Sequence, residues 1–335
     1  MKVKRERLLK ALETVSPGLS AKEIVEQSNC FVFRDGRVIT FNDEAAHSVT
    51  CKVGLEGAVQ SDPLLNLLRK LSEDELEVTA AEGEVRVRGQ RREAGIRLEQ
   101  EITLPVEGIE EPAEWKPLPE GFLDAVNIVR SCASNDESKF VLTCVHLHPK
   151  WIEACDNYQI ARYPLKTGIA NDVLIRQTSL KGVVNTELSE FSETENWMHF
   201  RKQDGPMISC RRYAEQYPSL DAYLESGGTV ITLPKGLDTA VNKASIFSED
   251  GDAARVTVEL RAKKARISGT GPNGWFRETL TTEYDGEQLK FVIDPRLLLE
   301  IVRRAEKIEV QPGRLSVSGG KFRYVTCTAT VEDER

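Results

Sequence analysis

Six short segments with helical hydrophobic spacing recur along the chain, and each is followed by strand-like alternating sequence. Successive segments start about 57 to 60 residues apart, near Arg5, Pro63, Glu120, Thr178, Lys235 and Pro295. A nearly fixed period of this kind indicates a repeated supersecondary unit. We therefore expect the shape that repetition builds to carry the function.

The hydrophobic pattern within each repeat predicts a helix followed by an antiparallel meander. In the first repeat, Leu8, Leu12 and Val15 fall at helical spacing, and two alternating runs then flank Asp35-Gly36. An Asp-Gly pair between alternating runs is a strong hairpin signal. The same pattern predicts turns at Glu82-Gly83, Asp204-Gly205 and Pro312-Gly313, and strands at Phe140 to Val145 and Val256 to Leu260.

Six copies of this unit in 335 residues predict an α+β fold of three similar domains, each with two helix-plus-meander repeats. The helices would line an inner face and the sheets would lie outside. Two stretches rich in turn-forming residues suit the connections between domains, Leu104 to Pro119 and Tyr217 to Gly228. The predicted domains span residues 1–106, 107–226 and 227–335, each large enough for its own core.

Composition excludes several other classes of protein. No apolar run approaches the ~20 residues of a membrane-spanning helix, and the charged start Met1-Lys2-Val3-Lys4 is unlike a signal peptide. We expect a cytoplasmic protein without a membrane partner. The seven cysteines are scattered without a Cys-x-x-Cys pair, which favours reduced, mostly buried thiols. Nothing in the sequence calls for a cofactor.

Basic residues concentrate in the helical segments. These six segments hold 13 Lys or Arg against 7 Asp or Glu, although the whole chain carries a net charge of −8. In the last segment, Arg296, Arg303 and Lys307 are seven and then four residues apart and would share one helix face. A solvated polar face would explain one such helix. The combined basic excess of the six segments predicts a basic stripe on an acidic body.

Duplex DNA is the polyanion that suits such a stripe. Lys and Arg side chains that neutralise phosphates release counterions, so the affinity falls steeply with salt and carries no sequence preference. The chain has no helix-turn-helix or zinc-finger pattern for reading bases. The sequence therefore predicts sequence-independent binding of double-stranded DNA.

The whole chain, in order, also resembles a known family of replication proteins. The resemblance is carried by the opening Arg5 to Leu12, by Cys155 to Ala161, by Tyr217 to Leu220 and by the closing Tyr324-Val325. These segments look like the bacterial sliding clamp, the beta subunit of DNA polymerase III. The resemblance implies a non-catalytic processivity factor: a head-to-tail homodimer of three-domain crescents that closes a ring around duplex DNA and tethers the polymerase.

Ten basic residues are candidates for contact with DNA on this hypothesis. Lys22 matches a loop position that contacts DNA in the family, and the others are chosen from their places on the predicted helices. Topological linkage needs only weak, uniform contacts, so each residue should contribute little. The set is Lys10, Lys22, Arg69, Lys70, Arg130, Lys181, Lys243, Arg296, Arg303 and Lys307.

The resemblance also implies two surfaces that close the ring. The first-domain surface would contain Ile96 and Leu98, on one side of a strand flanked by arginines. The third-domain surface would contain Ile246 and Phe247, which end the fifth helix beside Glu249-Asp250. A heterologous contact of this kind either closes or grows into filaments. The alternative is that these apolar residues belong to ordinary cores.

In the family, a groove between the second and third domains takes short peptides from polymerases and from the clamp loader. Asn157, Tyr158 and Gln159 stand where Gly-His-Arg is usual, and Asn157 can adopt the left-handed conformation that Gly supplies. The chain also ends in a more polar sequence, which leaves the peptide specificity open. The matching residues are Leu142, Ile160, Pro218, Tyr223, Val325 and Cys327 for the lining, and Asn157, Tyr158 and Gln159 for the rim.

Other apparent motifs have simpler interpretations. Gly269 to Gly274 fits G-x-G-x-x-G, but the strand-like sequence after it favours a hairpin turn over a nucleotide site. Cys144, His146 and His148 alternate along one strand without a fourth metal ligand, so no metal site is predicted. No catalytic motif is found. Two alternative functions stay open: a clamp-like monomeric scaffold without ring closure, and a nucleotide-binding oxidoreductase that uses Gly269 to Gly274.

Overall fold

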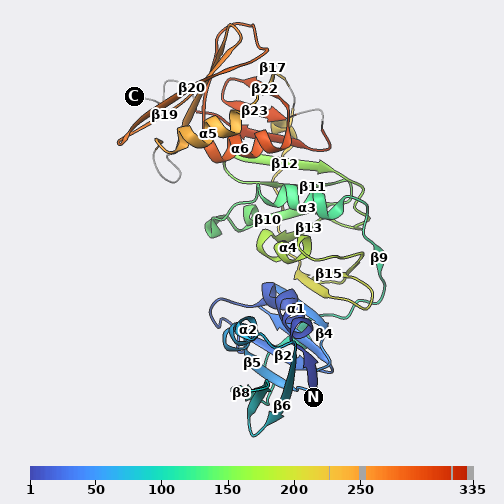
Figure 1. Cartoon of the computed structure of the whole chain (residues 1–335). Coiled ribbons are helices and arrows are strands. Elements are labelled where there is room, and N and C mark those ends of the chain that lie inside the picture. Colours follow the sequence, from blue (N-terminus) through green and yellow to red (C-terminus); the bar gives the residue numbers. More distant parts are fainter. Residues whose placement is uncertain (226, 249–253, 318–319, 330–335) are drawn as a thin grey trace. The chain divides into compact units, whose positions relative to one another are not determined.

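The computed structural model describes residues 1–225, 227–248, 254–317 and 320–329 (Figure 1). The contacts between residues divide the chain into two compact units. The first contains Met1–Ser131, Thr143–Lys150 and Leu165–Gln216, and the second contains Cys132–Leu142, Trp151–Pro164 and Tyr217–Arg335. The three domains with boundaries at 1–106, 107–226 and 227–335 stay a prediction.

Six α-helices occur within the described residues, and each begins within two residues of its predicted start. They pack in consecutive pairs, α1 with α2 and α3 with α4 in the first unit, and α5 with α6 in the second (Figure 1). Their bounds are α1 Arg5–Val15, α2 Ser61–Lys70, α3 Phe122–Arg130, α4 Gln177–Val184, α5 Leu237–Ser245 and α6 Pro295–Arg304.

The ends of α6 follow from local chemistry. The Asp294 side chain accepts a hydrogen bond from the Arg296 backbone N–H (2.8 Å), and Pro295 occupies the first helical turn. Both features are typical of a helix start. The helix ends at Arg304, and Lys307 begins strand β22 (Lys307–Gln311). The prediction that this helix extends to Lys307 is therefore wrong.

A continuous antiparallel sheet of twelve strands forms the body of the first unit, in the order β1-β6-β7-β8-β5-β2-β3-β4-β16-β15-β14-β9. In the same unit, β10 (Cys144–His148) pairs with β13 (Val173–Arg176). The strands of the large sheet are β1 Lys2–Lys4, β2 Cys30–Arg34, β3 Arg37–Phe41, β4 Ala45–Thr50, β5 Gly57–Gln60, β6 Glu75–Ala81, β7 Glu84–Arg88, β8 Glu93–Glu99, β9 Lys116–Pro117, β14 Glu190–Glu193, β15 Trp197–Arg201 and β16 Met207–Arg211.

Turn chemistry places the predicted hairpins. Asp35 and Gly36 both have positive φ (52° and 69°), and Glu82 and Gly83 do too (52° and 78°). Two residues with positive φ give a turn whose twist matches that of the flanking strands. The hairpins β2–β3 and β6–β7 are confirmed, as are the turns of β15–β16 and β22–β23.

The strand predicted from Phe140 to Val145 starts too early. A 3-10 helix, η3, covers Glu137–Thr143, and β10 begins only at Cys144. The Asp136 carboxylate accepts hydrogen bonds from the Ser138 backbone N–H (3.0 Å) and hydroxyl (2.7 Å). Such local side-chain bonds compete with strand pairing and favour a turn.

The predicted connection after Leu104 packs onto the first unit and covers part of it. Leu104 is buried in a cluster with Phe41 and Trp197, and Val106 and Ile109 pack against the same cluster. The cluster draws on strands β2, β3, β4, β5 and β15, and β4 also pairs with β16, where the first third of the chain meets the second. The connection therefore stabilises that junction through apolar burial.

The second unit contains two antiparallel sheets. Their strand orders within this unit are β11-β12-β24-β23-β22-β17 and β20-β19-β18-β21. The predicted strand Val256 to Leu260 is confirmed as β18. The bounds are β11 Trp151–Cys155, β12 Gln159–Pro164, β17 Thr229–Thr232, β18 Val256–Arg261, β19 Lys264–Gly271, β20 Gly274–Thr281, β21 Leu289–Ile293, β22 Lys307–Gln311, β23 Arg314–Val317 and β24 Arg323–Cys327.

The thiols follow the sequence prediction. All seven cysteines are free, six of them are buried, and Cys327 is exposed. Within the described ranges, no helix has the length and apolar character needed to cross a membrane. Among those same residues, no group of three or more His, Cys, Asp or Glu side chains is arranged to hold a metal ion.

Candidate nucleic-acid and partner interfaces

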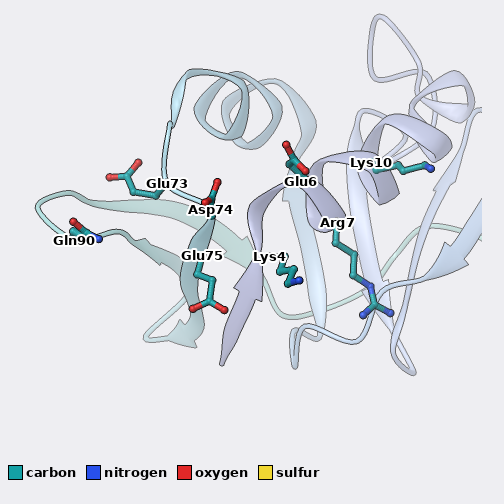
Figure 2. Close-up of a pocket in the computed structure, with 8 residues that line it drawn as sticks. All are labelled: Lys4, Glu6, Arg7, Lys10, Glu73, Asp74, Glu75 and Gln90. Atoms are coloured by element: carbon teal, nitrogen blue, oxygen red, sulfur yellow. The ribbon is translucent and has the colours of Figure 1, made fainter.

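Three exposed cations follow one another at three-residue spacing from β1 into α1. Lys4, Arg7 and Lys10 line one side of a surface concavity, and Glu73 to Glu75 line the other (Figure 2). None of the three cations forms an ion pair with another residue in the described part of the chain. Lys10 is one of the predicted DNA contacts, and Arg7 is not, although its helical spacing from Lys10 could have identified it.

Five of the ten predicted DNA contacts are exposed lysines that have no ion pair with any described residue. Their ammonium groups are therefore available for phosphates without first leaving a protein partner. Lys307 belongs to this set although it lies on β22 and not on a helix. The set is Lys10, Lys22, Lys70, Lys181 and Lys307.

Four other predicted contacts already form surface ion pairs. Exposed pairs of this kind contribute roughly 0 to 1 kcal/mol, so their cations can exchange a carboxylate for a phosphate. The pairs are Arg69 with Glu13 (3.0 Å), Lys243 with Glu278 (3.1 Å), Arg296 with Asp294 (2.6 Å) and Arg303 with Glu300 (2.8 Å). The tenth residue, Arg130, is half-buried at the end of α3, and desolvation lowers the pKa of its guanidinium.

Two glycines on β19 allow the backbone at the end of α5 to approach the strand closely. A Cβ atom at Gly269 would lie 2.0 Å from the Ala244 carbonyl oxygen, and one at Gly271 would lie 2.4 Å from the Phe247 carbonyl oxygen. Glycine is the residue that permits such a close backbone approach. Gly271 pairs with Gly274 across β19 and β20. The predicted hairpin is therefore confirmed, and the interpretation of Gly269 to Gly274 as a nucleotide site is wrong because a strand follows it.

This packing leaves an apolar corner exposed at the end of α5. Ile246 is 74% exposed and Trp275 is 66% exposed. Phe247 stacks on Phe276 with ring centroids 6.3 Å apart and planes 8° apart. Large apolar side chains gathered at the surface are typical of an interaction site. Trp275 is absent from the predicted site residues, although its place in an alternating strand could have suggested it. The predicted Glu249-Asp250 lies outside the described residues.

Strand β8 is incompletely paired on one side. β7 pairs with Glu93 to Arg97, whereas the pairing of β8 with β5 involves Leu98 and Glu99. Ile96 is half-buried and packs on the edge of the first core, while Leu98 is 6% exposed and belongs to that core. Ile96 can therefore contact a partner directly, and Leu98 mainly stabilises the surface that presents it.

Strands β12 and β24 bring part of the predicted groove together. Ile160 lies opposite Val325 in the register. Because directly opposite residues project from the same face, and so do residues two apart, Ile160, Val325 and Cys327 share one face of the sheet. Val325 is 8% exposed and Cys327 is exposed.

The connection after Gln216, which we call the strap (residues 217–225 and 227–228), lies over this same face. The Tyr217 hydroxyl accepts a hydrogen bond from the Cys155 backbone N–H (2.9 Å), and Cys155 lies opposite Ile160. Arg314 donates to the carbonyl oxygen of Glu225 (2.9 Å) from β23. The strap thereby carries the predicted lining residues Pro218 and Tyr223, of which Tyr223 is 60% exposed.

The predicted rim is shaped by Asp156. Its carboxylate accepts hydrogen bonds from the backbone N–H groups of Tyr158 (2.7 Å) and Gln159 (2.8 Å). This bonding produces a turn without a left-handed residue. Asn157 is not among the described residues with positive φ, so the turn forms without the left-handed conformation that Asn tolerates. Tyr158 is 54% exposed at the tip of the turn.

Two predicted groove residues have less exposed surroundings. The Tyr324 hydroxyl donates to Gln159 Oε1 (2.8 Å), and strand alternation places Gln159 on the face opposite Ile160. Leu142 is half-buried in η3, where its carbonyl accepts a hydrogen bond from the Ser134 N–H (2.8 Å). Both residues are therefore less suited to direct contact with a peptide in the predicted groove.

The histidine pair on β10 adjoins a carboxylate. The distances to Asp172 are 3.3 Å from His146 Nε2 and 3.8 Å from His148 Nε2. His148 Nδ1 accepts a hydrogen bond from the Lys150 backbone N–H (3.1 Å), which places the proton of a neutral ring on Nε2. That nitrogen then has no lone pair for a metal, and the arrangement suits a structural contact.

Together, the paired helices and the antiparallel sheets form the fold of DNA sliding clamps. The chain is similar over 99% of its length to the DNA polymerase sliding clamp of Pseudomonas aeruginosa, at 14% identity, with a TM-score of 0.81 and 99% of that chain covered. For the sliding clamp of Bacillus subtilis the values are 15% identity, a TM-score of 0.80 and 98% of each chain.

A third similar structure is the DNA polymerase III beta chain of Streptococcus pneumoniae TIGR4, at 18% identity and a TM-score of 0.81, with 98% of this chain and 99% of that chain covered. No protein-family model and no curated protein matches the sequence. At such low identity the shared property is the fold. The predicted α+β clamp fold is therefore confirmed over essentially the whole chain.

Proposed function

We propose that this protein is a DNA sliding clamp. Two copies would join head to tail, encircle duplex DNA and tether a replicative DNA polymerase for processive synthesis in the cytoplasm. The observation that carries the proposal is the likeness to solved clamps over the full length of both chains. The clamp would act without catalysis and without a cofactor, because linkage to DNA depends on shape.

The two proposed closing surfaces would be complementary. β8 has an open edge beside the half-buried Ile96, and β20 lies at the edge of its own sheet beside Ile246 and Trp275. Open edges can pair backbone to backbone, and apolar side chains can bury area around them. Arg97 on β8 and Glu278 on β20 would exchange their present partners, Glu99 and Lys243, for each other, so opposite charges would favour this pairing over pairing of like surfaces.

Contact with DNA would be weak and independent of sequence. The exposed lysines on α1, α2 and α4 supply point charges with no fixed geometry for reading bases. Each lysine that neutralises a phosphate would add about 0.9 to the slope of log affinity against log salt. Such contacts centre the duplex and still permit sliding.

The groove on the β12–β24 face would capture short peptides from the polymerase and from the clamp loader. Ile160, Val325 and Cys327 supply a floor on the sheet, and Pro218 and Tyr223 supply a wall on the strap. An apolar floor with a few polar groups at its rim suits a short extended peptide.

Retention on circular DNA tests encirclement directly. The protein is loaded by a bacterial clamp loader onto nicked circular DNA, and the DNA is then linearised. We expect retention on the circle and loss from the linear form. Equal retention on both forms would contradict the proposal, because binding without topological linkage does not depend on free ends.

Solution mass separates the proposal from the monomeric scaffold. Light scattering at micromolar concentration should give twice the chain mass of 37.5 kDa. A mass of one chain at that concentration would favour the scaffold.

A further inference from the structure

The strap is attached to one strand after another. Tyr217 bonds to Cys155 on β11 (2.9 Å), Asp221 to Arg162 on β12 (2.6 Å), and Gly227 to Glu309 on β22 (2.7 Å). Arg314 on β23 donates to the carbonyl oxygens of Tyr223 (3.5 Å) and Glu225 (2.9 Å). Among the described contacts of the strap with the sheet, the Arg162–Asp221 contact joins two opposite charges. This contact, which we call the latch, is therefore the one that salt should weaken.

Arg162 is prepared for this contact by its other neighbours. Its Nε donates to the buried carboxylate of Glu153 (2.6 Å), directly across the β11–β12 pair. Its guanidinium also lies over the ring of Trp151, at 4.6 Å from the centroid. A guanidinium fixed on two sides loses little conformational freedom when it binds a third group. Arg162 is thus held in place by the sheet, with one nitrogen directed at the strap.

The position of the strap sets the position of one wall of the proposed groove. Pro218 and Tyr223 flank Asp221 in the chain, so a shift of Asp221 moves both proposed wall residues. Tyr217 also covers Cys155, which is 4% exposed. Burial raises the pKa of the Cys155 thiol, which keeps it unreactive while the strap is in place.

We propose that the Arg162–Asp221 latch positions the strap over the β12–β24 face and so sets the partner groove in its binding-competent shape. The role of the groove rests on the function proposed above, whereas the latch itself does not. Arg162 and Asp221 are positioning residues: they act on a bound peptide through Pro218 and Tyr223. The expected ligand is an extended apolar peptide.

Asp221→Asn is the variant that tests the latch. The Asp221 side chain is 73% exposed, so the change removes charge without leaving a buried cavity. Arg162→Gln is less suitable alone, because it also removes the charged partner of the buried Glu153 carboxylate. A matched control is Asp43→Asn, which breaks a similar exposed pair with Arg211 (2.7 Å) in the first unit.

The reaction of Cys155 with a disulfide reagent reports the position of the strap. In a Cys327→Ser background, the remaining thiols are buried, and Cys155 lies directly beneath Tyr217. We expect the Cys155 rate to rise at least threefold in Asp221→Asn and to stay unchanged in Asp43→Asn. Raising the salt concentration should increase the rate in the parent protein and have little effect in Asp221→Asn. Equal rates in all three proteins would overturn the latch.

A peptide probe then tests the consequence for binding. A fluorescein-labelled pentapeptide with leucine and phenylalanine as its apolar residues is titrated by fluorescence anisotropy. We expect Asp221→Asn to bind at least threefold more weakly than the parent and the Asp43→Asn control. Equal affinity despite a faster Cys155 reaction would overturn the positioning role. Failure of the parent protein to bind would count against the proposed groove function, while the thiol rates still decide the latch.

Discussion

Replacing Gly182 with alanine tests how tightly side chains pack at the junction of β4 and β16. Gly182 lies in α4, and a Cβ atom there would lie 2.2 Å from His47 Cε1 and 2.9 Å from His47 Nε2. His47 is 2% exposed and is confined on another side by Gly18, where a Cβ would lie 2.8 Å from His47 Cδ2. The ring therefore has little room to move away.

Two opposing effects set the size of the change. Alanine is favoured over glycine inside a helix by about 1 kcal/mol. Overpacking a filled core costs about 1 to 3 kcal/mol. Because the predicted overlap involves a confined ring, we expect strain to exceed propensity, with Gly182→Ala less stable by about 1 kcal/mol.

The same substitution should change sign when the ring is absent. In a His47→Ala background the overlap disappears, and Gly182→Ala should stabilise by up to about 1 kcal/mol. The coupling free energy between the two positions is then about 2 kcal/mol. The free energies come from urea unfolding of the two single variants, the double variant and the parent.

A glycine without close neighbours serves as the control for the Gly182→Ala substitution. Gly108→Ala should be close to neutral, because nothing lies within 4 Å of a Cβ at that position. If Gly182→Ala has the same effect with and without the His47 ring, the packing argument is refuted.

Three further predictions follow from the described contacts. Burial lowers the pKa of His47 and of His199 from 6.5 to about 4, so below pH 6.5 the unfolded chain binds protons that the folded chain does not. The free energy of unfolding should therefore fall between pH 6.5 and pH 4, by up to about 3 kcal/mol for each histidine. In urea titrations, His47→Gln should flatten this dependence of stability on pH. Trp275→Ala should weaken self-association at least tenfold in sedimentation, whereas Thr279→Ala on the same strand should not; equal association of both variants would argue against the proposed corner. Gly269→Ala should lower the melting temperature, since the new Cβ meets a backbone oxygen at 2.0 Å and not a flexible side chain, and an unchanged temperature would show that α5 can shift freely.

The sequence identified features that depend on neighbouring residues. Asp35-Gly36 and Glu82-Gly83 form the predicted turns because their positive φ values are a local property. The start of α6 follows from Asp294 and Pro295 in the same way. The hairpin at Gly269 to Gly274 was predicted from the strand-like residues after it.

Prediction from the sequence was weaker where hydrogen bonding and strand packing, more than residue type, decide the outcome. The turn at Asn157 depends on how Asp156 bonds to the backbone, so the residue type at one position did not determine its φ. Gln159 lies on the face opposite Ile160 because side chains alternate along β12. Matching single residues to the family's groove positions does not take this alternation into account. Trp275 was missed because its exposure depends on β20 lying at the edge of its sheet in the described part of the chain.

By itself, the sequence determined the repeated helix-and-meander unit, the turns and the excess of basic residues on the helices. These features come from periodicity and local backbone preference, which act over a few residues. The tertiary structure decided which cations are already paired, which apolar residues are exposed and how the strap is attached to β11, β12, β23 and β22. Arg162 and Asp221 are 59 positions apart, and their contact exists because two strands and a connection converge in space. No local pattern encodes a contact over that separation.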